Sequence, residues 1–200
     1  MYMSKFAAVL AVLIFPVTAF SGTEVSGDQS GVWTSAGSPY LVTGEIVVPA
    51  GQALTIEPGV EVNFQGHYKF TVNGCLAAAG TEADSIFFTT DDQSTGWGGL
   101  RIDSDDVCTL TFCSIEFGKT SGSYPDIHGG GLALLSSDAI VSNCTFADND
   151  ATGSDNGMGG AIKFTGDLNT EITECEFLEN DCLYGGGAIS GYMITGTKLT

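Results

Sequence analysis

Three cysteines recur at a constant interval, and this interval constrains the fold more than any other feature of the chain. Cys113, Cys144 and Cys175 are separated by 31 residues each time. An apolar residue stands three positions before each cysteine and another two positions after it: Leu110, Val141 and Ile172, then Ile115, Phe146 and Phe177. Such a fixed period is typical of solenoids, in which one supersecondary unit repeats along an axis.

Glycine pairs followed by apolar residues punctuate the same region less regularly. They stand at Gly98-Gly99, Gly130-Gly131, Gly159-Gly160 and Gly186-Gly187, and the last two intervals are 29 and 27 residues. The turns therefore differ in length while the strands keep their register, which is how solenoids accept insertions.

Each repeat has the pattern of short β-strands joined by bends. Cys175 and Phe177 alternate with two glutamates, a period of two. Ile172 has the opposite parity, so we expect a bend near Thr173 or Glu174. Coiling such strands stacks rungs about 4.8 Å apart and places equivalent apolar side chains over one another. The pattern predicts an all-β fold, a right-handed parallel β-helix in a single domain.

The N-terminal half shows the same construction with shorter turns. Asn73-Gly74 is a strong hairpin signal, so an antiparallel β-sandwich is the rival fold. A sandwich does not account for the fixed interval late in the chain. We expect residues 22–52 to form an N-terminal strand or cap region and residues 53–200 to form the rungs.

Residues 1–21 have the features of a secretory signal peptide. Lys5 precedes an apolar run from Phe6 to Val17, and small residues follow. A buried helix or an uncleaved anchor is the alternative. No later stretch has the roughly 20 apolar residues of a spanning helix, so we expect no transmembrane helix in the mature segment. The chain is expected to be secreted or exposed at the cell surface.

Acidic residues dominate the charge of the chain. There are 24 Asp and Glu against 6 Lys and Arg, a net charge of −18. Such a surface repels nucleic acid and anionic lipid. The 43% of hydrophobic residues and 12 Phe argue for a packed core instead of an acidic disordered chain.

Two families resemble parts of the chain. GGAI at 159–162 and 186–189, with FxxN at 146–149 and 177–180, resembles the repeats of chlamydial polymorphic outer membrane proteins. Residues 54–60 and 97–100 resemble the first rungs of secreted proteins of the pectate-lyase-like superfamily. The resemblance covers about residues 31–200. It implies a β-helix at an outer membrane or cell surface, but the superfamily includes lyases, hydrolases, adhesins and passenger domains.

Six cysteines in an exported chain raise the question of disulfides. Three stacked thiols cannot all pair, so we interpret the 31-residue series as a column of small buried hydrophobic side chains. Cys75, Cys108 and Cys182 fall outside this column. Any disulfide is expected to involve one of them, with a partner that the sequence does not identify.

The chain offers few candidates for metal binding. Asp148 to Gly153 matches the start of a calcium loop, but Gly159 stands where a bidentate Glu belongs. We assign no metal or cofactor, although adventitious or structural calcium is compatible with these acidic turns. Repeated Asn149 and Asn180 are expected to cap backbone groups at a corner of each rung.

The candidates for catalysis are equally few. Arg101, near Asp103 and Asp105 in the sequence, is the base that a lyase of this superfamily would use. His67 and His128 lie in Gly-rich loops without a repeated acidic partner, and we expect His128 to be an ordinary loop residue. We therefore assign no catalytic residue.

The leading hypothesis is a non-catalytic surface or secreted β-helix for adhesion, carbohydrate contact or display, with glycans or cell-surface molecules as partners. The alternative is a polysaccharide lyase or glycoside hydrolase. Residues 194–200 have the pattern of a further repeat, so we expect either a truncated sequence or a protein that stacks on a partner.

Overall fold

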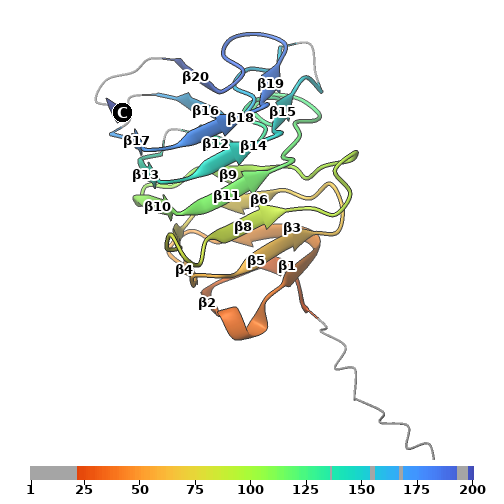
Figure 1. The fold of residues 1–200 in the computed structure, drawn as a ribbon, viewed down its shortest axis with the longest axis vertical. Coiled ribbons are helices and arrows are strands. Elements are labelled where there is room, and N and C mark those ends of the chain that lie inside the picture. The colour runs from red at the N-terminus through yellow and green to blue at the C-terminus, as the bar shows by residue number, and fades with distance from the viewer. Residues whose placement is uncertain (1–21, 136, 154–155, 167–168, 193–197) are drawn as a thin grey trace, which may run out of the picture.

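The computed structural model describes residues 22–135, 137–153, 156–166, 169–192 and 198–200. The proposed signal peptide lies outside the described residues, as do residues 194–197 of the expected last repeat. Between the described strands, every pairing is parallel. The fold is the predicted right-handed parallel β-helix, with rungs stacked along its long axis (Figure 1). The β-sandwich is wrong, because it would need antiparallel pairs.

Each rung contributes one strand to each of three faces. The first face contains β5 (Glu61–Phe64), β8 (Ile86–Thr89), β11 (Cys113–Glu116), β14 (Thr145–Ala147) and β18 (Glu176–Leu178). The second contains β6 (Phe70–Val72), β9 (Leu100–Ile102), β12 (Leu132–Leu135), β16 (Ile162–Thr165) and β20 (Ile189–Tyr192). The third contains β2 (Gly31–Trp33), β4 (Ala53–Ile56), β7 (Cys75–Ala79), β10 (Cys108–Thr111), β13 (Ala139–Ser142), β17 (Glu171–Thr173) and β21 (Lys198–Leu199).

The N-terminal strands continue the same parallel stacking. The long strand β3 (Tyr40–Val48) pairs with β5 through its first half and with β6 through its second half, so it joins the first two faces. Strand β1 (Thr23–Asp28) pairs with β3. A short 3-10 helix, Ser35–Gly37, separates β2 from β3, and a small pair, β15 (Asp150–Ala151) and β19 (Asp181–Cys182), extends one corner.

Bends between strands recur at the 31-residue period. Phe112, Asn143 and Glu174 have φ of 48°, 53° and 53°, in the left-handed region. Glu174 is one of the two residues at which the sequence predicted a bend, and that prediction is confirmed. A second series of left-handed residues, Phe117, Asp148 and Glu179, turns the chain at the next corner.

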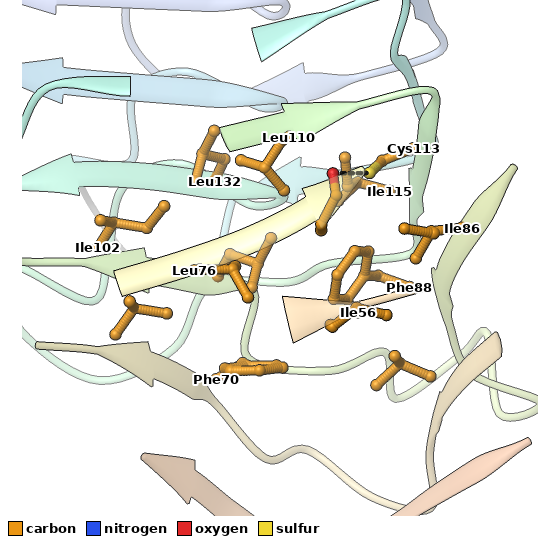
Figure 2. Packing of buried hydrophobic residues seen from close by; sticks show 14 of the residues in the cluster. Ile56, Phe70, Leu76, Ile86, Phe88, Ile102, Leu110, Cys113, Ile115 and Leu132 are labelled. Atoms are coloured by element: carbon orange, nitrogen blue, oxygen red, sulfur yellow. Dashed lines mark hydrogen bonds between the residues drawn. The ribbon is translucent and has the colours of Figure 1, made fainter. Parts of the chain in front are cut away.

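The core is filled by the predicted inward ladders. Leu110 pairs with Val141, which pairs with Ile172. Ile115, Phe146 and Phe177 form the parallel ladder on the first face, and the rings of Phe146 and Phe177 stack with centroids 5.4 Å apart. Figure 2 shows side chains from the three faces converging on one apolar interior. Since the interior is apolar, any chemistry must come from outward side chains and turns.

The cysteine column is also present. Cys113 and Cys144 are buried, and the backbone N–H of Cys113 donates to Sγ of Cys144 at 3.4 Å. All six cysteines, each of which the structure describes, are free thiols. Cys75 and Cys108 occupy positions of opposite parity on neighbouring strands, so their side chains point to opposite sides of the sheet and cannot bridge without backbone movement.

Among the described residues, no helix is long and apolar enough to cross a membrane.

Candidate functional site

A hollow on the described surface contains a lysine, two carboxylates and a histidine. We call it the lysine hollow. Its volume is about 210 Å³, and it is lined by Glu45, His67, Lys69, Gly98, Ser121, Gly122 and Asp126.

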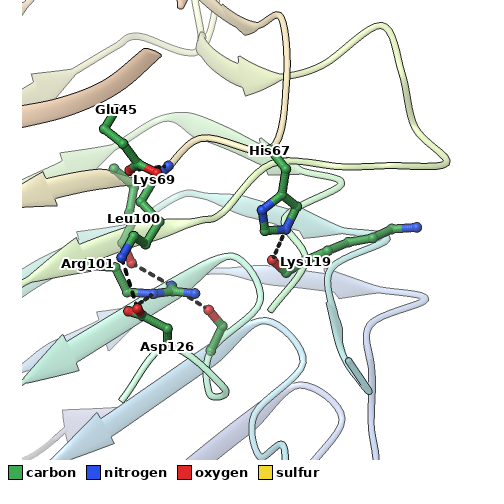
Figure 3. A network of polar contacts seen from close by, with 8 residues as sticks. Glu45, His67, Lys69, Leu100, Arg101, Lys119 and Asp126 are labelled. Atoms are coloured by element: carbon green, nitrogen blue, oxygen red, sulfur yellow. Dashed lines mark hydrogen bonds and ion pairs between the residues drawn. The ribbon is translucent and has the colours of Figure 1, made fainter. Parts of the chain in front are cut away.

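The parallel register of the helix brings the first part of the lysine hollow together. Glu45 lies on β3, and Lys69 immediately precedes β6, which pairs with the second half of β3. Oε2 of Glu45 accepts a hydrogen bond from the backbone N–H of Lys69 at 2.9 Å (Figure 3). The carboxylate is therefore fixed at the wall of the hollow.

Asp126 reaches the lysine hollow from the long turn between β11 and β12. Its Oδ2 lies 2.9 Å from Nζ of Lys69, and its Oδ1 lies 3.8 Å from Nε of Arg101. One carboxylate thus faces two cations, one at the surface and one behind it (Figure 3).

Arg101 forms the buried floor behind Asp126. It is 3% exposed although it points outward from β9, and its Nη1 donates to the carbonyls of Leu100 at 3.0 Å and Gly129 at 2.8 Å. Burial lowers the pKa of Arg101 to about 10, while the charge of Asp126 acts in the opposite direction. The guanidinium therefore stays charged at neutral pH, and its Nε has no hydrogen-bond partner among the described residues.

His67 occupies the edge of the lysine hollow. Its Nε2 lies 3.0 Å from the carbonyl oxygen of Lys119, a distance at which the imidazole N–H donates. Every charged side chain of the hollow is thus already held by a neighbour. Such a set offers fixed donors and acceptors to a polar ligand.

The lyase residues suggested by the sequence do not assemble. Strand β9 ends at Ile102, and the following turn carries Asp103 and Asp105 to a separate hollow of about 320 Å³ with Asn73. Arg101 therefore faces Asp126 and not the acids that follow it in the sequence. The turn after β9 therefore separates Arg101 from the two acids that follow it in the sequence.

His128 lies in a turn, as the sequence predicted. It is 8% exposed, and its ring packs edge-on against Tyr124 with centroids 5.8 Å apart. Burial lowers the pKa of His128, and Lys163 and Arg101 lower it further.

The partial calcium loop lies at a different corner. Asp148 and Asp150 line an open hollow of about 340 Å³ with Glu179 and Asp181. Oδ1 of Asp150 accepts from the backbone N–H of Thr152 at 2.6 Å. Across the residues that the structure describes, no three His, Cys, Asp or Glu side chains are arranged to hold a metal ion. Calcium binding stays an untested prediction.

Asn149 and Asn180 have the structural role that the sequence predicted. Asn149 is fully buried, and its side chain caps the backbone N–H of Gly118 and the carbonyl of Ile115 at 2.9 Å each. Nδ2 of Asn180 makes the equivalent bond to Phe146, one rung further on.

Sequence reasoning missed Glu45, Lys69 and Asp126. Lys69 carried a usable signal, because it stands one residue before a strand whose register places it near Glu45. Asp126 carried none, since it lies in a turn of variable length.

Comparisons with known proteins agree with this architecture. The family model described as "Right handed beta helix region" matches residues 59–197. The Drosophila melanogaster protein named "Protein bark beetle" is 32% identical over 80 residues, which is 40% of this chain and 2% of that protein. The chain therefore spans a very small part of this relative. No solved structure matches.

Proposed function

Because the chain belongs to the right-handed β-helix family, we propose that it is an exported, non-catalytic repeat protein that contacts carbohydrate at or outside the cell surface. The lysine hollow is the contact site in this proposal. The neighbouring rungs would supply further weak contacts along the axis, and such contacts add when they are held at a fixed spacing.

One observation carries the proposal: the charged groups of the lysine hollow are paired with their own neighbours. Lys69 is bound by Asp126, and Glu45 is bound to the backbone. Fixed carboxylates and N–H groups suit the hydroxyls of a sugar, which both donate and accept. The net charge of −18 favours a neutral ligand over an anionic one.

Glycan-array binding with purified protein tests this proposal. The variants Glu45→Gln and Lys69→Met should each lower binding of any bound glycan at least several-fold, because each removes a fixed polar contact. Asp103→Asn, which alters an acid of a different hollow, is the matched control and should bind like the wild type. Absence of binding to neutral glycans, or equal binding by Lys69→Met, would contradict the proposal.

A second candidate function is glycoside hydrolysis, and a different observation favours it. Two carboxylates, Glu45 and Asp126, line the same hollow as His67. Paired carboxylates are the usual catalytic groups of glycosidases. Incubation with neutral glycans, polygalacturonate and alginate, with and without calcium, separates the candidates: release of shorter products that is lost in Glu45→Gln would establish the enzyme.

A further inference from the structure

The turn before β12 covers a strip of the second face. We call Ser121–Gly131 the cover segment. On this face, β9, β12 and β16 place Arg101, Ala133 and Lys163 side by side in register. These are outward positions, yet they are 3%, 0% and 5% exposed. The strip is therefore buried by turns and not by the core.

The cover segment is held at its C-terminal end by backbone groups. The carbonyl of Gly129 accepts from Arg101, and its N–H donates to the carbonyl of Met158 at 3.0 Å. Gly130 donates to Gly159 at 3.3 Å. His128 immediately precedes these contacts and is only 8% exposed, so its side chain is buried at this end of the segment.

His128 lacks a partner for one ring nitrogen. Its Nδ1 is buried without a hydrogen bond among the described residues. A neutral imidazole tolerates a buried nitrogen without a donor or acceptor partner, because one of its nitrogens carries no proton. A protonated ring would bury both a charge and an unmatched N–H donor, which is costly in a protein interior.

The charges around His128 oppose protonation. Arg101 approaches from β9 and Lys163 from β16, while β12 and β20 present the uncharged Ala133 and Ser190. Nζ of Lys163 is 3.2 Å from Oγ of Ser190 and 3.9 Å from Sδ of Met158, so its described contacts are uncharged. Within the cover segment, Tyr124 packs on the ring, and Asp126 is bound by Lys69 and Arg101.

The direction of the pH effect follows from these contacts. Burial, Lys163 and Arg101 all lower the pKa of His128 below its ordinary 6.5. An open segment would titrate near the ordinary value, so it binds more protons than the closed one in the interval below 6.5. The closed segment is therefore fully stabilised above pH 6.5. This stabilisation weakens as the pH falls toward the lowered pKa of His128.

We propose that the cover segment is an acid-released cover, closed over Arg101 at neutral pH and detached when His128 is protonated. Detachment would bare Arg101, free Lys69 from its pair with Asp126, and remove Ser121, Gly122 and Asp126 from the lysine hollow. In a chain of net charge −18, acidification would thus create a local cationic strip. The proposal concerns the segment itself and does not depend on what the hollow binds.

Hydrogen exchange followed by mass spectrometry tests the cover at about pH 7.5 and about pH 5.5, on either side of the ordinary histidine pKa. After correction for the intrinsic rates, protection of residues 126–131 should fall several-fold at the lower pH, while that of β12 is retained. His128→Gln should abolish the difference, because glutamine does not titrate. His67→Gln removes the other histidine and should keep the pH-dependent difference in protection.

Lys163→Met provides a second test if His128→Gln does not fold. It removes one repelling cation, so the loss of protection should become smaller. Equal protection of the wild type at both pH values would overturn the proposal. The same pH-dependent loss in His128→Gln, or a loss shared equally by β12, would also overturn it.

Discussion

The side-chain amide of Asn149 lies against that of Asn180 on the next rung, with Nδ2 of Asn149 2.9 Å from Oδ1 of Asn180. The same oxygen of Asn180 accepts from the backbone N–H of Asn149 at 3.1 Å. The two residues, 31 apart in the sequence, therefore form a polar ladder beside the apolar ones. Each amide satisfies backbone groups of the preceding rung that the corner leaves unpaired.

Asn149→Ala should destabilise the protein by about 3 kcal/mol. It leaves the N–H of Gly118 and the carbonyl of Ile115 buried without their partners, and each such group costs about 1–3 kcal/mol. Chemical denaturation measures the loss. Asn169→Ala, at an exposed site, is the control and should change stability by less than about 0.5 kcal/mol. Equal stability of the two variants would show that the ladder is not needed.

The inward ladders could be predicted from the sequence because their members recur at a constant period. A spacing of 31 residues fixes the register of Leu110, Val141 and Ile172 before any coordinates are known. The parity change before Cys175 likewise predicted a bend near Thr173 or Glu174, and the structure has it at Glu174. Local pattern and global fold agree at these positions.

The candidate site could not be predicted in the same way. Lys69 and Asp126 are 57 residues apart and meet through a turn whose length follows no period. A constant period predicts the register of the strands, but it does not predict where a turn of variable length will lie. Arg101 shows the opposite case. Asp103 and Asp105 are close to it in the sequence, but the turn after β9 places them in a different hollow. The resemblance to polymorphic outer membrane proteins and the signal peptide stay predictions.

The ion pairs of Asp126 should differ strongly in their effect on stability. Asp126→Asn leaves the buried Arg101 without a counter-charge, and we expect a loss of about 2 kcal/mol, below the roughly 3–5 kcal/mol of a closer buried pair. Lys69→Met removes a partner at the surface and should cost less than about 1 kcal/mol. Urea denaturation of both variants checks the order, and a larger loss for Lys69→Met would contradict the assignment of Arg101 as the dependent group.

Five of the six thiols should divide into two groups in their reaction with iodoacetamide in the native protein. Cys75 and Cys182 are half-buried and should be alkylated first. The hydrogen bond with Cys113 is the main cause that raises the pKa of Cys144 to about 12, and the bond with Cys144 likewise raises that of Cys175. The thiolate is the reactive form, so both should stay unmodified until denaturant is added.

Peptide mapping by mass spectrometry identifies the modified thiols. Cys108, which is buried and whose pKa is raised by burial, serves as an internal reference for a protected thiol. Early alkylation of Cys144 before Cys75 would mean that the column does not have the packing described above.

Asp92 should titrate well below an ordinary aspartate. The hydroxyl of Ser94 donates to its Oδ1 at 2.6 Å, and the backbone N–H of Thr95 does so at 3.2 Å. The bond from Ser94 is the main cause that lowers the pKa of Asp92 from 3.8 to about 2. Because the pKa is lowered in the folded state, the stabilisation is present above 3.8 and is lost as the pH falls through about 2.

An NMR titration of the Asp92 carboxyl group tests this value. Ser94→Ala should move the midpoint upward toward 3.8, since it removes the largest contribution while leaving the backbone bond from Thr95. Ser123→Ala, in another exposed turn, should leave the midpoint unchanged. A midpoint near 3.8 in the wild type would mean that Ser94 does not hold the carboxylate in solution.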